Sequence, residues 1–165
     1  TVVGYFAMAQ RTISMPMSLI AQSIGDVFRQ RASEEYRTKG NCPIIYMKTL
    51  KALSILGIVP CLFLIIIAPN LFGLIFGEQW TIAGRYVQML SFMLYFRLIS
   101  SPLSMMYMIA EKQSKDLLLQ IYIICSVTIT IYLGWYYGEN PELSIFLFSL
   151  NYCLIYSVNL YITKK

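Results

Sequence analysis

The sequence contains no histidine among its 165 residues. This absence excludes His-based acid–base catalysis, a Ser-His-Asp triad and the usual histidine-containing zinc sites. Cysteine is also scarce, and the four present form no Cys-x-x-Cys pair: Cys42, Cys61, Cys125 and Cys153. Three of them fall within hydrophobic segments, so we expect reduced, structural thiols. We therefore expect no bound metal and no cofactor.

Charged residues are few, and long hydrophobic runs are many. The sequence is 13% charged and 58% hydrophobic, with a mean hydropathy of +0.62. Soluble domains are about 25% charged and about 45–50% apolar. Three segments carry no charge and reach the roughly 20 residues that one membrane span needs: 52–77, 117–138 and 143–163. Two further apolar segments, 2–28 and 82–110, contain only isolated charges.

These segments predict an all-α fold, a polytopic transmembrane helix bundle with five spans. We place the spans at about residues 2–28, 46–68, 82–110, 117–137 and 143–163, within a single membrane domain of residues 1–165. The chain begins on Thr1, without an initiator methionine, and runs directly into the first hydrophobic segment. We therefore expect it to be the C-terminal piece of a longer protein.

The net charge of +5 follows the predicted loops. Lysine and arginine gather in residues 29–51, in residues 112–115 and at residues 164–165. The alternate loops, 69–80 and 139–142, contain only acidic charges: Glu78, Glu139 and Glu142. The positive-inside rule therefore predicts a cytoplasmic C-terminus and a chain that enters from outside. Both tryptophans, Trp80 and Trp135, fall at the predicted outer interface, which suits indole. The basic excess thus indicates topology, and no nucleic-acid partner is expected.

Three prolines fall within predicted spans: Pro16, Pro60 and Pro102. Each removes a backbone hydrogen bond and tends to kink its helix, which would suit a moving part. Proline is also commoner in membrane helices generally, so a purely structural role is equally open. The third segment, at about 29 residues, exceeds a hydrocarbon core of about 30 Å and must tilt, break or protrude. The run of residues 100–102, Ser-Ser-Pro, is the expected place for a break.

The first span has one polar face. At roughly 100° per residue, its small, polar and basic residues lie within about 60° of Arg11: Gly4, Ala7, Ser14, Ser18, Gln22, Gly25 and Arg29. The other side is apolar: Phe6, Ile13, Met17, Ile20, Ile24 and Val27. Because a charge in hydrocarbon is costly, we expect the polar face to look at other helices or at a water-filled cavity. The kink at Pro16 makes the phase of this stripe approximate.

Arg11 lies roughly 12 Å inside the span at helical rise, too deep for an ordinary interfacial residue. Guanidinium bonds phosphate oxygens in a planar, bidentate manner and keeps its charge. Arg11 is therefore a candidate for holding an anionic substrate, with Ser14, Ser18 and Gln22 lining the same cavity. The alternative is a buried arginine that is satisfied by a carboxylate or carbonyls of a neighbouring helix.

The third span offers a second polar lining. Arg97 lies in its inner half and shares a face with Ser101 and Ser104. Arg85 is nearer the outer end, where it either lines the cavity or snorkels to the headgroups.

Other polar residues in the spans have two interpretations. Asp26 is a candidate for coupling to protons, although a local ion pair with Arg29 explains it equally well. Five amide and hydroxyl side chains are expected to form hydrogen bonds between helices and not to bind ligands: Gln120, Thr128, Thr130, Asn151 and Asn159.

Three sequence motifs carry a resemblance to a known family. Residues 3–28, VGYFAMAQRTISMPMSLIAQSIGDVF, open with a glycine–aromatic pair and continue through Ala-Gln-Arg and a Met-Pro step. Residues 68–90, APNLFGLIFGEQWTIAGRYVQML, contain Phe-Gly-Glu-x-Trp followed by Ala-Gly, and residues 101–104 read SPLS. In this order the motifs resemble the C-terminal part of bacterial polysaccharide flippases of the multidrug/oligosaccharidyl-lipid/polysaccharide exporter superfamily. The resemblance rests on motifs over about the first 115 residues and on hydropathy beyond them.

The resemblance implies a two-lobed transporter of 12 or more helices, in which this chain would be the last five of the second lobe and the N-terminal lobe its missing partner. Such proteins move lipid-linked oligosaccharide, usually on a polyprenyl diphosphate, across the bacterial inner membrane for surface polysaccharide such as O-antigen. Arg11 and Arg97 would then hold the diphosphate or acidic sugars, while the lipid tail stays in the bilayer.

Two alternatives remain. A drug or small-molecule exporter of the same superfamily would carry its coupling carboxylates mainly in the other lobe. A membrane enzyme that acts on lipid-linked sugars needs a catalytic acid, base or metal set, and the scattered Glu78, Glu139 and Glu142 do not resemble one. A non-enzymatic transporter is therefore expected.

Overall fold

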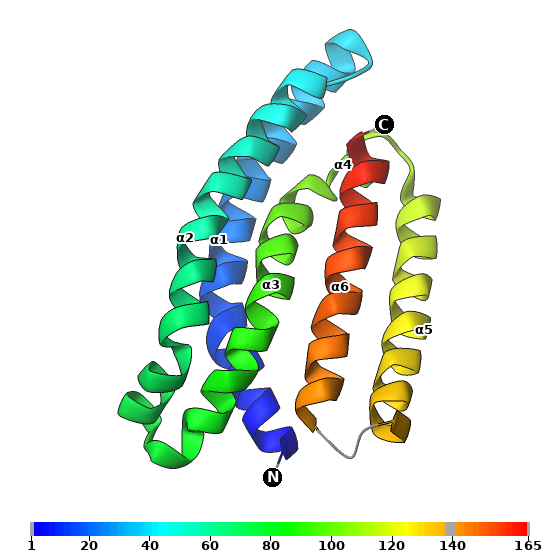
Figure 1. Cartoon of the computed structure of the whole chain (residues 1–165). Coiled ribbons are helices and arrows are strands. Elements are labelled where there is room, and N and C mark those ends of the chain that lie inside the picture. Colours follow the sequence, from blue (N-terminus) through cyan, green and yellow to red (C-terminus); the bar gives the residue numbers. More distant parts are fainter. Residues whose placement is uncertain (1, 138–140, 165) are drawn as a thin grey trace.

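The computed structural model describes residues 2–137 and 141–164, and every regular element within them is a helix (Figure 1). The elements are α1 (Val2–Lys39), α2 (Pro43–Phe76), the 3₁₀ turn η1 (Glu78–Trp80), α3 (Thr81–Leu103), α4 (Met106–Ile109), α5 (Gln113–Tyr137) and α6 (Pro141–Lys164). The predicted all-α fold is confirmed. Thr1, Glu139 and Lys165, which the topology prediction used, lie outside the described residues, as does the side chain of Trp135.

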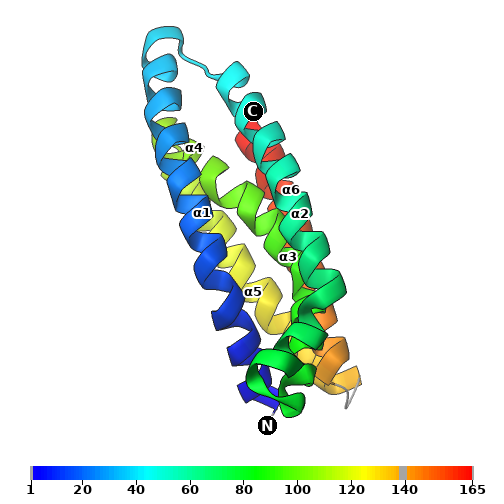
Figure 2. The ribbon, with the colours of Figure 1, turned by 90° about the vertical axis from the view of Figure 1, so that its left-hand side faces the viewer.

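Four stretches of this bundle are long and apolar enough to cross a membrane: Pro43–Phe76, Glu78–Ile109, Gln113–Gly134 and Pro141–Lys164. The fifth predicted span lies in α1, which is 38 residues long but too polar to join them by composition. Nevertheless α1 packs against α3 within the bundle, with α2 on the other side of α3 (Figure 2). Its crossing of the membrane stays a prediction, which this position supports.

Two segments predicted as loops are mostly helical. Residues 29–43 follow the first predicted span, but α1 continues to Lys39 and leaves a connection of residues 40–42. Residues 69–80 were expected to be an outer loop, but α2 continues to Phe76 and a single 3₁₀ turn follows. The sequence interpretation was wrong here because it ended each helix where the apolar segment ends. A helix ends where its backbone geometry changes, and Gly77, at a φ of 99°, is that point in α2.

Pro69 lies inside α2 without ending it. Its ring nitrogen has no hydrogen, so the carbonyl of Ile65, four residues earlier, loses its helical donor. The side-chain amide of Gln88 in α3 donates a hydrogen bond to that carbonyl instead. A neighbouring helix thus satisfies the backbone group that the proline leaves free, which is the condition for an interior proline in a membrane helix.

The expected break in the third span is present. Helix α3 ends at Leu103 and α4 begins at Met106, so the interruption follows Pro102 closely. The N–H of Met105 donates to the carbonyl of Pro102 at 3.3 Å, a tighter turn than that of an α-helix. In contrast, Pro16 and Pro60 lie within continuous helices.

Helix α3 is the centre of the bundle and packs against α1, α2 and α6, while α5 packs on the far side of α6 (Figure 1). Its buried residues take part in two apolar clusters. One joins Ala9 of α1 and Phe72 of α2 to Val87 of α3. The other lies towards the opposite end and joins Phe28 of α1 and Leu53 of α2 to Leu103 of α3.

Glycine permits the closest contact between α2 and α3. A methyl group added at Gly84 would lie 2.5 Å from the Cα of Pro69 and 2.7 Å from the carbonyl oxygen of Ala68. These are backbone atoms, which cannot move aside as a side-chain end can. We therefore predict that Gly84→Ala lowers the free energy of unfolding by about 1–3 kcal/mol through overpacking. The midpoint of thermal unfolding in detergent, followed by circular dichroism, measures this loss.

Gly25→Ala is the matched control, because its added methyl would make only ordinary contacts, at 3.7 Å from Pro102. Alanine favours the helix, so this variant should be neutral or slightly stabilised. Equal midpoints for the two variants would contradict the prediction.

Asn159 links three helices within the membrane-spanning part of the bundle. Its amide oxygen accepts a hydrogen bond from the Tyr107 hydroxyl at 2.8 Å, and its amide nitrogen donates to the Ser100 hydroxyl at 2.8 Å. The side chain is buried, with 5% of its surface exposed. The prediction that Asn159 forms a hydrogen bond between helices is therefore confirmed.

We predict that Asn159→Leu destabilises the chain by about 1–2 kcal/mol, because Tyr107 and Ser100 both lose their partner in a buried place. Ser157→Ala is the control, since this exposed hydroxyl bonds only the Cys153 carbonyl of its own helix. The same thermal measurement compares them, and a loss no greater than that of the control would contradict the role of Asn159.

Candidate functional site

A polar groove of about 200 Å³ lies between α1 and α3. Helix α1 contributes Ser14, Ser18 and Gln22, and α3 contributes Arg97 and Ser101. Four of the five residues predicted for the substrate cavity therefore lie together: Ser14, Ser18, Gln22 and Arg97. Gly25 and Pro102 form part of the wall, so the groove reaches the region where α3 is interrupted. Ser104, the second serine predicted beside Arg97, does not line it.

The polar groups of the groove have capacity for a ligand. The Ser18 hydroxyl donates to the carbonyl of Met15, which leaves its oxygen free to accept. Within the described part of the chain, neither an ion pair nor a side-chain hydrogen bond is found for Arg97 or Gln22. Arg97 is exposed on α3 where it lines the groove, so its guanidinium is accessible to a ligand.

Arg11 lies outside the groove. The buried residues nearest to it are Ala9 and Ile13, each two positions away and thus about 200° around the helix. Its side chain is exposed and has no ion-pair partner among the described residues. Beyond Pro16 the buried positions of α1 move to Ala21 and Gly25, which adjoin the polar stripe. The face that contacts the bundle therefore changes along α1, and Arg11 points away from the other helices of this chain.

The remaining charged candidates form ion pairs, one within α1 and one between α3 and α6. Asp26 lies 3.9 Å from Arg29, one helical turn along, and both side chains are largely exposed. Arg85 lies 4.0 Å from Glu142 at the start of α6, at the end of the bundle opposite the α1–α2 connection. The contact of Asp26 with Arg29 fits the local ion pair that the sequence left open. The position of Arg85 near one end of the bundle fits the snorkelling to headgroups that the sequence left open. A coupling role for Asp26 stays a prediction.

The other amide and hydroxyl residues behave in two ways. Asn151 donates to the Ser126 hydroxyl at 3.3 Å and so links α6 to α5, as expected. Thr128 and Thr130 instead bond carbonyls of their own helix, those of Ile124 and Ser126. The expectation of bonds between helices was wrong for these threonine hydroxyls, because a threonine hydroxyl in a helix readily reaches the carbonyl four residues earlier.

The profile of the family described as "Polysaccharide biosynthesis protein" matches residues 1–85. The chain belongs to this family. The matched residues comprise α1, α2, η1 and the first residues of α3, so they include the α1 side of the groove but not Arg97. No curated protein and no solved structure matches the chain. Together with the four apolar helices, the family makes this a multi-pass membrane protein of polysaccharide biosynthesis.

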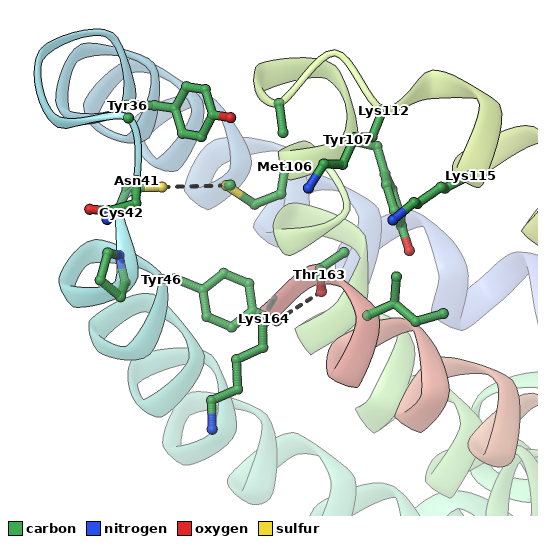
Figure 3. A pocket seen from close by; sticks show the side chains of 14 residues that line it. Tyr36, Asn41, Cys42, Tyr46, Met106, Tyr107, Lys112, Lys115, Thr163 and Lys164 are labelled. Carbon is green, nitrogen blue, oxygen red and sulfur yellow. Dashed lines mark hydrogen bonds between the residues drawn. The ribbon is translucent and has the colours of Figure 1, made fainter.

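A second pocket, of about 380 Å³, lies at the end of the bundle where the α1–α2 connection, the α4–α5 connection and the end of α6 meet (Figure 3). Sequence reasoning missed it. Three of its lysines, Lys112, Lys115 and Lys164, were used only to orient the chain. Lys112 and Lys115 are three residues apart, but Lys164 follows them at the far end of α6, so only the fold brings Lys164 to the same pocket.

Cys42 lies in the wall of this second pocket. The thiol is buried, and its sulfur lies 3.5 Å from the sulfur of Met106. Burial raises the pKa of the Cys42 thiol above its ordinary value, and the negative charge of Glu35 raises it further. Both causes disfavour the thiolate, so Cys42 stays protonated and weakly nucleophilic at neutral pH. All four cysteines are free thiols, as expected.

We predict that Cys42 reacts with iodoacetamide only at a pH above the ordinary thiol pKa of about 8.5, because the thiolate is the reactive form. The measurement is the rate of alkylation against pH in a variant that keeps Cys42 as its single cysteine. Glu35→Gln in that background removes one cause of the shift and should move the profile to lower pH. A profile unchanged by Glu35→Gln would contradict the electrostatic part of the argument.

Proposed function

We propose that this chain is part of a flippase that moves lipid-linked oligosaccharide, carried on a polyprenyl diphosphate, across the bacterial inner membrane. The observation that carries the proposal is the groove between α1 and α3, where Arg97 and three polar side chains of α1 line one concavity of the bundle. Such a lining is costly to keep in a membrane protein and marks a path for a polar substrate. The family supports polysaccharide as the product to which the substrate belongs.

Different parts of the substrate would be bound by different groups of the protein. The guanidinium of Arg97 would hold a phosphate or an acidic sugar by charge-assisted hydrogen bonds, and Ser14, Ser18 and Gln22 would bond sugar hydroxyls. The polyprenyl tail would remain in the bilayer, against the exposed apolar surface of the helices. This division needs no covalent chemistry, so a transporter without enzymatic activity is part of the proposal.

The groove is too small to enclose an oligosaccharide by itself. About 200 Å³ is less than the roughly 300–1,000 Å³ of pockets that enclose a drug-sized ligand. An oligosaccharide therefore needs further walls. We propose that an N-terminal lobe of the complete protein supplies them, and that Arg11, which points away from this chain's other helices, faces that lobe.

Alternating access fits the position of the groove. In the proposed transporter two lobes rock around a site near the middle of the membrane. The groove touches Pro102, next to the interruption between α3 and α4, and α1 contains Pro16 beside the groove residue Ser14. Rocking would use these two points, where the backbone lacks a hydrogen bond. The charge pattern of the loops adds a cytoplasmic C-terminus to this proposal.

The test is Arg97→Gln in the chromosomal copy of the complete protein. Loss of one charge-assisted contact, worth about 1.5–3 kcal/mol, should lower transport about tenfold or more. We expect less surface polysaccharide on gels and an accumulation of lipid-linked repeat units on the cytoplasmic leaflet, with unchanged amounts of the protein in the membrane. Arg11→Gln should have the same direction of effect if the N-terminal lobe faces it.

Arg85→Gln is the matched control, since it removes the same charge at the periphery of the bundle and should leave polysaccharide normal. Normal polysaccharide in Arg97→Gln together with greater drug sensitivity would favour an exporter of small molecules. Repeat units that reach the surface but remain unpolymerised would favour a membrane enzyme. Either result would overturn the proposal that the protein is a flippase.

A further inference from the structure

The second pocket has a basic wall and no acidic one. Its lining includes Lys112, Lys115 and Lys164 and contains no aspartate or glutamate. In Figure 3 the ammonium groups of Lys112 and Lys115 extend into the same space, whereas that of Lys164 is directed away from them. None of these three lysines forms an ion pair within the part of the chain that the structure describes. Two positive charges therefore share one concavity without a carboxylate.

Acidic side chains occur nearby but do not neutralise the pair. The Glu35 carboxylate accepts a hydrogen bond from the Lys39 ammonium at 3.0 Å and does not line the pocket. Glu111 and Asp116 adjoin the two lysines in sequence, yet neither comes within ion-pair distance of them. An anionic ligand would supply the negative charge that these carboxylates do not bring to the two lysines.

The opposite wall of the pocket is held rigidly. The Tyr46 hydroxyl and the Thr163 hydroxyl share a hydrogen bond of 2.8 Å, and Tyr46 also donates to the Leu160 carbonyl at 3.0 Å. Next to them, Tyr107 is bonded to Asn159. These contacts tie α2, α4 and α6 together at the pocket, so its shape does not depend on a ligand. A preformed pocket loses less conformational entropy on binding.

The position of the pocket indicates a lipid and not a soluble anion. It lies where the candidate membrane spans of α2 and α6 begin and end, which is where lipid headgroups would lie. Its lining mixes the lysines with apolar side chains such as Met106 and Ile162, and a lipid presents a charged headgroup next to apolar chains. The loop charges predict that this end faces the cytoplasm.

We propose that this pocket binds the phosphate group of an anionic lipid headgroup, with Lys112 and Lys115 as its positive contacts. Lysine serves as a point charge for phosphate, and basic pockets between membrane helices hold lipid headgroups in this way. The bound lipid would lie at the α1–α2 connection, against α4 and the end of α6. This inference is independent of the flippase, because it concerns retention of a lipid and not transport.

The experiment is native mass spectrometry of the purified 165-residue chain in detergent with added dioleoyl phosphatidylglycerol or dioleoyl phosphatidylcholine. We expect tighter binding of the anionic lipid. The double variant Lys112→Gln/Lys115→Gln should weaken phosphatidylglycerol binding about tenfold and leave phosphatidylcholine binding unchanged. Thermal unfolding of each variant verifies that the fold is kept.

The matched control is Lys48→Gln/Lys51→Gln, which removes two exposed lysines of α2 at the same end of the bundle but outside the pocket. It should change phosphatidylglycerol binding less than twofold. Equal losses in the two double variants would overturn the pocket as the site, and equal binding of both lipids would overturn the role of the phosphate charge. Full competition by inorganic phosphate, without lipid retention, would overturn the lipid as the source.

Discussion

The close contact of α2 with α3 is the constraint on which the rest of the bundle depends. At Gly84 the two backbones are so near that no side chain fits between them. One turn further on, Gln88 of α3 reaches the Ile65 carbonyl that Pro69 leaves free in α2. Apolar side chains gain little from leaving lipid for another apolar surface, so membrane helices associate through close packing and hydrogen bonds. Close packing and a hydrogen bond both occur at this contact between α2 and α3.

The central position of α3 follows from this contact and decides where polar groups meet. Helix α3 also packs against α1 and α6. Its surface on the α1 side forms one wall of the groove and contains Arg97. Near the interruption after Pro102, Ser100 of α3 accepts a hydrogen bond from Asn159 of α6, and Asn159 in turn accepts one from Tyr107 of α4. The same helix therefore borders the groove and is hydrogen-bonded to α6, which lines the second pocket.

The two concavities differ in what they can bind. The groove carries one guanidinium with hydroxyl and amide groups, a set suited to a sugar attached to phosphate. The pocket carries two ammonium groups beside apolar side chains, a set suited to a lipid headgroup. In the proposed flippase the pocket would hold a lipid at the membrane surface, while the groove would hold the substrate during its passage. Neither role requires the other.

The sequence by itself determined the helical class, the apolar segments, the break near Pro102 and the set of polar residues on α1. Composition and periodicity suffice for these, because a backbone in lipid must satisfy its own hydrogen bonds and almost always becomes helical. The meeting of Arg97 with Ser14, Ser18 and Gln22 required the fold, since a wheel gives the phase of each helix but not which edges face each other. The orientation of Arg11 and the position of Lys112 and Lys115 beside the α1–α2 connection and the end of α6 were likewise decided only by tertiary structure. The contact face of α1 shifts around Pro16, and the packing of four segments brings the pocket walls together.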